Sequence, residues 1–205
     1  MKLHHILLQP VLILASLSVY GQGTFIYDQQ SSTDDLVSGY GGVTMQQIPA
    51  PWGQSFTPSL ASVGFVRLKL YDGDTGDGTG ATVYLNLHSN SISGPILAST
   101  APVPMPSLFH GVTNFFFANP VLVTPGVPYY IEPVVQSGGA WNIDVSSYNY
   151  PGGLEYYGGG IPSGASDLWF REGIVVPEPS AGLLMLVGSS VYVYARRTRN
   201  KRRLS

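Results

Sequence analysis

Apolar and polar residues alternate with a period of two along much of the chain between residues 22 and 176. In residues 65–71 the even positions are apolar, while Arg67 and Lys69 take odd positions, and residues 82–89 alternate in the same way. A period of two places successive side chains on opposite faces of a β-strand. No segment here shows the 3.6-residue apolar period of an amphipathic helix. The pattern therefore predicts half-buried strands.

Further strands are predicted at 96–101, 111–117, 121–123, 128–135, 141–146 and 167–174. Gly, Pro and Asn residues separate them, and Pro125 and Gly126 take the central positions of a predicted type II turn. Residues 29–50 show little periodicity and are predicted to form a long connection or an edge. About eight to ten short strands joined by such turns predict an all-β fold, an antiparallel jelly-roll-like β-sandwich.

An uncharged apolar run at residues 181–194 is followed at once by a basic cluster, which consists of Arg196, Arg197, Arg199, Lys201, Arg202 and Arg203. A helix over 181–195 would span about 22 Å, less than the roughly 30 Å hydrocarbon core of a bilayer. Alone, this run fits either a buried helix or a weak membrane span. The basic cluster favours a single C-terminal transmembrane helix, because Lys and Arg stay on the cytoplasmic side. A basic tail that binds nucleic acid would leave the apolar run unexplained.

A Pro-Glu-Pro motif precedes the apolar run, in the segment Val176, Pro177, Glu178, Pro179. Together, the motif, the helix predicted at 181–195 and the basic tail at 196–205 resemble the PEP-CTERM sorting signal. The resemblance covers residues 177–205. It implies recognition and cleavage at Pro-Glu-Pro by an exosortase-type membrane protease, in a bacterium that makes exopolysaccharide.

The N-terminus carries a second targeting segment. Lys2 begins a weakly basic region, residues 6–20 are mostly apolar, and Gly21 provides a small residue for cleavage. Residues 1–21 therefore predict a secretory signal peptide, with an uncleaved N-terminal anchor as the alternative. Together the two ends predict an exported protein that is transiently held in the inner membrane and then reaches the cell surface or extracellular matrix.

Residues 22–176 remain as one domain, long enough to bury a core. The whole chain has ten Lys and Arg against twelve Asp and Glu, but this domain has three basic residues against eleven acidic ones, a net charge near −8. The acidic surface argues against binding nucleic acid or other anionic polymers through charge. The chain has no cysteine, which excludes disulfides, thiolate catalysis and cysteine-ligated zinc.

Three carboxylates alternate in a glycine-rich loop at residues 72–80, namely Asp72, Asp74 and Asp77. Carboxylate oxygens on a flexible, glycine-rich backbone would suit a structural Ca²⁺ ion. Ca²⁺ is the only cofactor that the sequence suggests. The spacing is not that of an EF-hand, since Gly76 stands where a third acidic ligand would lie. The alternative is a polar loop without a metal, in which the Asp and Gly residues are present because they readily adopt turn conformations.

Tyrosines and glycines are concentrated at residues 148–160, where aromatic rings could stack on sugars. The candidate ligand-binding residues are Trp141, Tyr148, Tyr150, Tyr156 and Tyr157. The alternative is that these rings cover one end of the sandwich, because aromatic side chains bury a large area. The strand pattern of the domain also resembles the β-sandwich domains that often precede this sorting tail, some of which are similar to carbohydrate-binding modules.

Catalysis finds little support in the sequence. The HExxH and GxSxG patterns are absent, and the glutamates Glu132, Glu155 and Glu172 lie in no recognisable catalytic context. The first hypothesis is therefore a non-catalytic, exopolysaccharide-associated surface or matrix protein with a structural or binding role. The alternatives are a carbohydrate-binding module with an aromatic sugar site and a secreted glycan-acting enzyme.

Overall fold

The computed structural model describes residues 23–36, 41–45, 51–157, 160–164 and 166–177. Residues Thr24–Val176 form one compact unit. The signal peptide predicted at 1–21, the helix predicted at 181–195 and the basic tail lie outside the described residues. Within the described part, no helix is long and apolar enough to cross a membrane.

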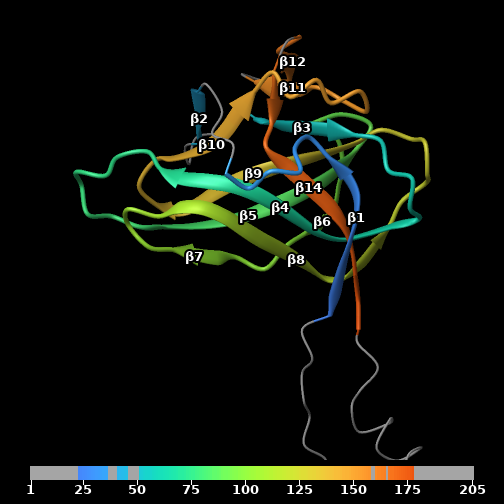
Figure 1. Cartoon of the computed structure of the whole chain (residues 1–205), viewed down its shortest axis with the longest axis horizontal. Helices are drawn as coiled ribbons and strands as arrows, with labels where there is room; N and C mark the ends of the chain where they lie inside the picture. The colour runs from blue at the N-terminus through green and yellow to red at the C-terminus, as the bar shows by residue number, and fades with distance from the viewer. Residues whose placement is uncertain (1–22, 37–40, 46–50, 158–159, 165, 178–205) are drawn as a thin grey trace, which may run out of the picture. The chain divides into compact units, whose positions relative to one another are not determined.

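All assigned elements in the described residues are strands (Figure 1). Their bounds are β1 Thr24–Gln30, β2 Gly41–Met45, β3 Gly53–Phe56, β4 Ser62–Asp72, β5 Ala81–Ser89, β6 Ile96–Ser99, β7 Val103–Met105, β8 His110–Leu122, β9 Tyr129–Gly138, β10 Trp141–Ser146, β11 Glu155–Tyr157, β12 Ile161–Pro162, β13 Asp167–Leu168 and β14 Phe170–Val176. The all-β prediction is therefore confirmed for this part of the chain.

The strands form two antiparallel sheets. Sheet A has the order β1-β14-β4-β10-β13, with β8 paired to β4 and β2 paired to β10. Sheet B has the order β12-β11-β3-β9-β5-β6, with β7 also paired to β5. The chain crosses repeatedly between the sheets, since β3, β5 and β9 belong to sheet B while β4, β8 and β10 belong to sheet A.

The core lies between the sheets and follows the alternation seen in the sequence. Apolar residues at even positions of β4, such as Leu68, and at odd positions of β5, such as Leu85, are fully buried. They pack in one cluster with Phe115 of β8, Ile131 of β9 and Trp141 of β10. Burying each such side chain stabilises the fold by about 1.5–3 kcal/mol. The shared core gives the two sheets a β-sandwich-like arrangement.

Some predicted boundaries differ from the structure. The segments predicted at 111–117 and 121–123 are one strand, β8, because its pairing with β4 continues past a bulge near Gly64. The segment 29–50 contains β2, which pairs only with β10 and so lies at an edge. The turn predicted at Pro125 and Gly126 is confirmed, since Gly126 has φ +79° and the Val127 N–H donates to the Thr124 carbonyl oxygen at 3.2 Å.

Candidate functional site

The outer face of sheet B carries a row of polar side chains across its central strands. In β9, Ile131 points into the core, so Glu132 points outward. In β5, Leu85 and Leu87 point inward, so Asn86 and His88 share the outer face. The register places Asn86 opposite Glu132, with His88 beside it on the same strand. Antiparallel pairing thus gathers residues that lie about 45 positions apart in the sequence.

Hydrogen bonds join these side chains into one network. Asn86 Nδ2 donates to Glu132 Oε2 at 2.8 Å, and His88 Nε2 lies 3.0 Å from the same oxygen. At one end of the network, Ser99 Oγ donates to Asn86 Oδ1 at 2.6 Å. At the other, His88 Nδ1 lies 2.9 Å from the Gly94 carbonyl oxygen. We call Ser99, Asn86, Glu132 and His88 the Glu132 row.

The Glu132 row contains an ion pair. The Gly94 carbonyl and the Glu132 carboxylate can only accept hydrogen bonds, so both ring nitrogens of His88 must carry protons. Burial disfavours charge on both side chains. The hydrogen bonds outweigh burial, and they raise the pKa of His88 and lower the pKa of Glu132 below their usual values. Glu132 therefore presents an ionised carboxylate, and its side chain is 20% exposed.

Aromatic rings flank this row on the same face. Tyr130 of β9 and Tyr156 of β11 lie with ring centroids 5.4 Å apart at an interplanar angle of 71°, an edge-to-face pair. Tyr84 of β5 lines an open surface pocket of about 510 Å³ together with Ser99 and Val134. Asn86 and His88 are buried, at 6% and 4% exposure, so the Glu132 carboxylate and the exposed Ser99 hydroxyl are the groups of the row that a ligand can reach, with tyrosine rings beside them.

The structure distributes the five aromatic residues selected from the sequence over different surroundings. Trp141 and Tyr150 lie in the core, at 0% and 8% exposure, so neither presents a ring to a ligand. Tyr148 donates to Asp144 Oδ1 at 2.9 Å, and burial together with this bond raises its pKa. Tyr157 is exposed beside Trp52. Only Tyr156 faces the Glu132 row.

Tyr150 has a structural role. Its hydroxyl donates to Gln29 Oε1 at 2.9 Å and accepts the Thr57 N–H at 3.3 Å, so it ties β1 to the segment after β3. Burial raises the pKa of Tyr150 to about 12. For Trp141 and Tyr150, the structure therefore matches the alternative in which aromatic rings bury area within the sandwich.

The carboxylates of the loop at 72–80 turn to separate backbone amides. Asp72 Oδ2 accepts the Leu108 N–H at 2.8 Å, and this bond helps to lower the pKa of Asp72. Asp74 Oδ1 accepts the Gly76 N–H at 3.1 Å, and Asp77 Oδ1 accepts the Thr79 N–H at 2.6 Å. Among the described residues, no group of three or more metal-ligating side chains occurs. Calcium binding stays a prediction, with no preformed ligand cluster to support it.

The sorting motif lies at the boundary of the described part. Val176 ends β14, and Pro177 is exposed immediately after it. Glu178, Pro179 and the basic cluster lie outside the described residues, so the sorting signal stays a prediction.

Sequence reasoning missed most of the Glu132 row. The alternation in β5 does place Asn86 and His88 outward, as predicted, but their pairing with Glu132 depends on the register between β5 and β9. The usable signal was the period of two in residues 128–135, which puts Tyr130 and Glu132 on one face. Comparison with models of protein families found no match to this chain, and comparison with curated proteins also found none.

Proposed function

We propose that this chain is a non-catalytic glycan-binding protein of the bacterial cell surface or extracellular matrix, associated with exopolysaccharide. In this proposal the signal peptide directs export, and the sorting tail holds the protein in the inner membrane until an exosortase-type protease releases it. The β-domain, jelly-roll-like in outline, is the functional part.

The observation that carries the binding role is the Glu132 row with its flanking tyrosines. Sugar hydroxyls donate to carboxylates and accept from amide groups, and a pyranose ring stacks its C–H face on an aromatic ring. The Glu132 carboxylate accepts bonds from His88 and Asn86 through one oxygen, Oε2. Its second oxygen, Oε1, makes no hydrogen bond within the described residues. The row also holds only one carboxyl group, whereas a glycosidase uses two.

The test is binding of the full-length chain to exopolysaccharide from the native host, measured by affinity electrophoresis. We expect Tyr156→Ala to weaken binding about tenfold, which corresponds to about 1.4 kcal/mol of lost ring contact. Glu132→Gln should also weaken it, because the amide cannot replace both carboxylate oxygens as acceptors. Tyr157→Ala is the matched control, since this neighbouring ring is exposed beside Trp52 instead, and it should bind normally.

Two results would overturn the proposal. Unchanged binding by both Tyr156→Ala and Glu132→Gln would remove the row from the binding surface. Release of new reducing ends from the polysaccharide, abolished by Glu132→Gln, would show a catalytic carboxylate in place of a binding one.

A further inference from the structure

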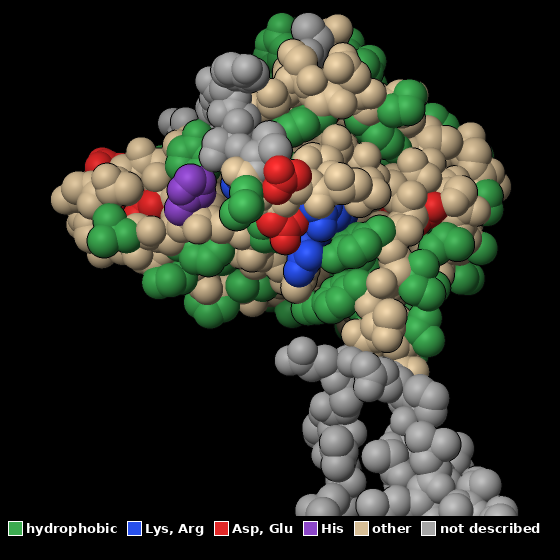
Figure 2. Space-filling model, in the orientation of Figure 1, with side chains coloured by type: hydrophobic (Ala, Val, Ile, Leu, Met, Phe, Trp, Pro, Cys, Tyr) green, Lys and Arg blue, Asp and Glu red, His purple; other side chains and the backbone are tan. Residues whose placement is uncertain are grey.

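The three cations of the domain gather on the outer face of sheet A, opposite the Glu132 row. Arg67 and Lys69 are two residues apart on β4 and therefore share a face. Arg171 of β14 lies directly opposite Arg67 in the register. Figure 2 shows blue basic side chains beside red acidic ones on one face of the domain. The domain has three basic and eleven acidic residues, so the face that carries all three cations is the one best suited to attract an anion.

Two of the three cations have carboxylate partners. Lys69 Nζ lies 3.5 Å from Asp144 Oδ2. Arg171 Nη2 lies 2.6 Å from Asp35 Oδ1, without the angles of a directed hydrogen bond, so this contact is an ion pair. Arg171 also packs its guanidinium 4.7 Å from the centre of the Trp169 ring. Their charges are therefore balanced within the fold.

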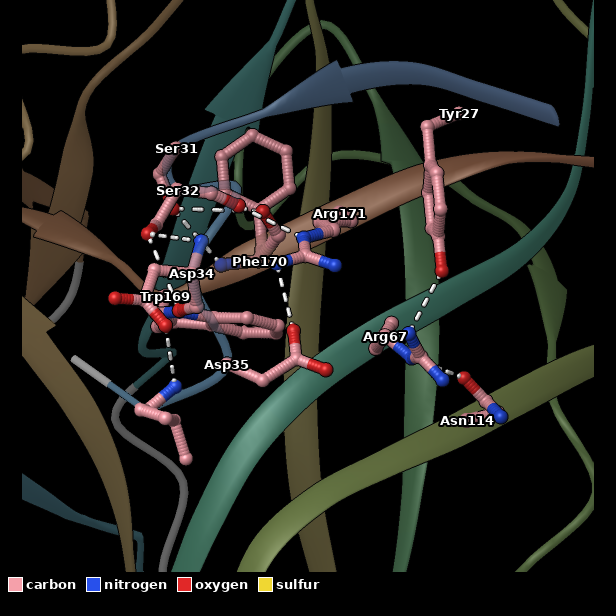
Figure 3. Close-up of polar contacts among 11 residues, drawn as sticks. Tyr27, Ser31, Ser32, Asp34, Asp35, Arg67, Asn114, Trp169, Phe170 and Arg171 are labelled. Carbon is pink, nitrogen blue, oxygen red and sulfur yellow. Dashed lines mark hydrogen bonds and ion pairs between the residues drawn. The ribbon is translucent and has the colours of Figure 1, made fainter. Parts of the chain in front are cut away.

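Arg67 forms no ion pair within the described residues. Its Nε donates to Asn114 Oδ1 at 2.8 Å, and its Nη1 donates to the Tyr27 hydroxyl at 2.7 Å (Figure 3). The guanidinium lies 5.7 Å from the Phe25 ring centroid and 5.9 Å from that of Tyr27. Three strands thus fix its orientation, because Tyr27 is on β1, Arg67 on β4 and Asn114 on β8. Its positive charge is left for a ligand.

Arg67 and its two hydrogen-bond partners each have protons left to donate. Arg67 has five N–H groups, and its two bonds use two of them. Asn114 turns its oxygen to Arg67, which leaves its NH₂ to donate. The Tyr27 oxygen accepts from Arg67, which leaves its own proton to donate. A fixed cation with N–H groups left to donate selects an anionic acceptor, and a guanidinium edge matches a carboxylate in particular.

An exposed ring adjoins these donors. Phe116 of β8 is 46% exposed. Its ring centroid lies 6.0 Å from that of Phe25 and 6.4 Å from that of the buried Phe65. The site therefore combines a carboxylate-binding cation with an apolar platform two residues away along β8 from Asn114. A sugar acid carries both matching features, a carboxylate and a flat C–H face.

We propose that Arg67, Asn114, Tyr27 and Phe116 form a binding site for the carboxylate of an acidic sugar, a uronate residue of a polysaccharide. Arg67 pairs with the carboxylate, Asn114 and Tyr27 hold the guanidinium in its orientation, and the sugar ring stacks on Phe116. The site lies on the opposite sheet from the Glu132 row and does not depend on the function proposed for that row.

The experiment measures calorimetric binding of oligogalacturonate to the full-length chain, with the methyl-esterified oligomer as the uncharged comparison. Binding should require the free carboxylate of the sugar. Arg67→Lys should weaken binding at least tenfold, because lysine keeps the positive charge but lacks the paired N–H groups that hold both oxygens of a carboxylate. Asn114→Asp should abolish binding without lowering thermal stability, since the new carboxylate would neutralise Arg67. Phe116→Ala should weaken binding of the oligomer about fivefold and leave binding of acetate unchanged.

The control is Leu122→Ala, because Leu122 is exposed elsewhere on β8 and has no part in either site, so this variant should bind oligogalacturonate as the wild type does. The Glu132 row lies on sheet B, so failure of the function proposed for that row leaves this test unaffected. Equal binding of the ester, or unchanged affinity in folded Arg67→Lys and Asn114→Asp, would overturn the proposal. Binding of inorganic phosphate or single-stranded DNA as tightly as the uronate would overturn the assignment to a sugar carboxylate.

Discussion

Glu172 of β14 is a carboxyl group in the interior of the domain. Its side chain is fully buried, and neither carboxyl oxygen makes a hydrogen bond within the described residues. Burial, followed by the negative charge of Asp28, raises the pKa of Glu172 to about 9. Burial also opposes ionisation of Asp28, but donors from Leu60 and Ser59 outweigh it and lower the pKa of Asp28. At neutral pH, Asp28 is therefore charged and Glu172 is protonated.

Replacement of Glu172 should change how stability depends on pH. Between its ordinary pKa near 4.5 and about 9, the folded state holds a proton that the unfolded state releases, so unfolding free energy falls as pH rises. The slope from this one group is at most about 1.4 kcal/mol per pH unit. We expect the unfolding free energy of Glu172→Gln to fall less steeply with pH than that of the wild type, and to be higher than the wild-type value at pH 8. Urea denaturation at pH 5, 6.5 and 8 measures the unfolding free energy of both proteins.

Two features of the experiment isolate the contribution of Glu172 to the pH dependence of stability. The raised pKa of His88 also makes stability fall as pH rises, but this contribution is present in both proteins and cancels. Asp77→Asn is the matched control, because this exposed carboxylate accepts only a local backbone N–H. A wild-type slope retained by Glu172→Gln would show that Glu172 is ionised in the folded protein.

At the scale of elements, the pairing of β1 with β14 depends on a glycine. Gly173 pairs with Tyr27 next to a bulge in β1. A Cβ atom at this position would lie 1.9 Å from the Ile26 carbonyl oxygen. The backbones can approach this closely only because residue 173 has no side chain. The same pairing holds Tyr27 over Arg67 and Arg171.

Gly173→Ala should therefore destabilise the domain by about 1–3 kcal/mol, because the two backbones must separate. Gly76→Ala should change stability by less than about 0.5 kcal/mol, since its Cβ would meet only Asp74 Oδ1 at 3.4 Å in an exposed loop. Guanidinium denaturation midpoints compare the two. Equal midpoints would mean that β1 does not contribute to the cooperative core.

Strands with one apolar and one polar face could be predicted from the sequence, and others could not. The alternation identified β4 and β5, because the apolar side chains on one face of each strand, such as Leu68 and Leu85, are buried in the core. The shorter β3 has Gly53, Gln54 and Ser55, all buried, which gives no apolar period. Gln54 is held there by bonds to Asp167 and to the Leu168 N–H, and these contacts depend on the fold.

The candidate sites were less predictable than the strands for the same reason. Residue type alone selected Trp141 and Tyr150, although both fill the core. Glu132 and Arg67 became candidates because each is hydrogen-bonded to a side chain on another strand, Asn86 and Asn114 respectively. Cross-strand register decides those neighbours, and the pattern of one strand does not reveal it, because register follows from how the paired strands and turns pack together.

At the scale of the whole molecule, the compact unit ends where processing is proposed. Thr24 and Val176 are paired residues of β1 and β14, so the chain enters and leaves the unit at adjacent positions. Cleavage after Gly21 and near Pro177 would therefore remove no strand of either sheet. It would also remove the basic cluster and leave a domain near −8 in net charge, on which the Arg67 face is the local exception.

The mature protein recovered from the cell surface and medium of the native host should have lost both ends. We expect its intact mass to match a chain that starts near Gln22 and ends between Pro177 and Pro179. Its thermal unfolding midpoint should equal that of the full-length chain, because the core lies within Thr24–Val176. A product that retains Arg196 and the residues after it would contradict release by a sorting protease. The tail would then act as a permanent anchor, and both proposed sugar-binding faces would belong to a protein that stays attached to the cell.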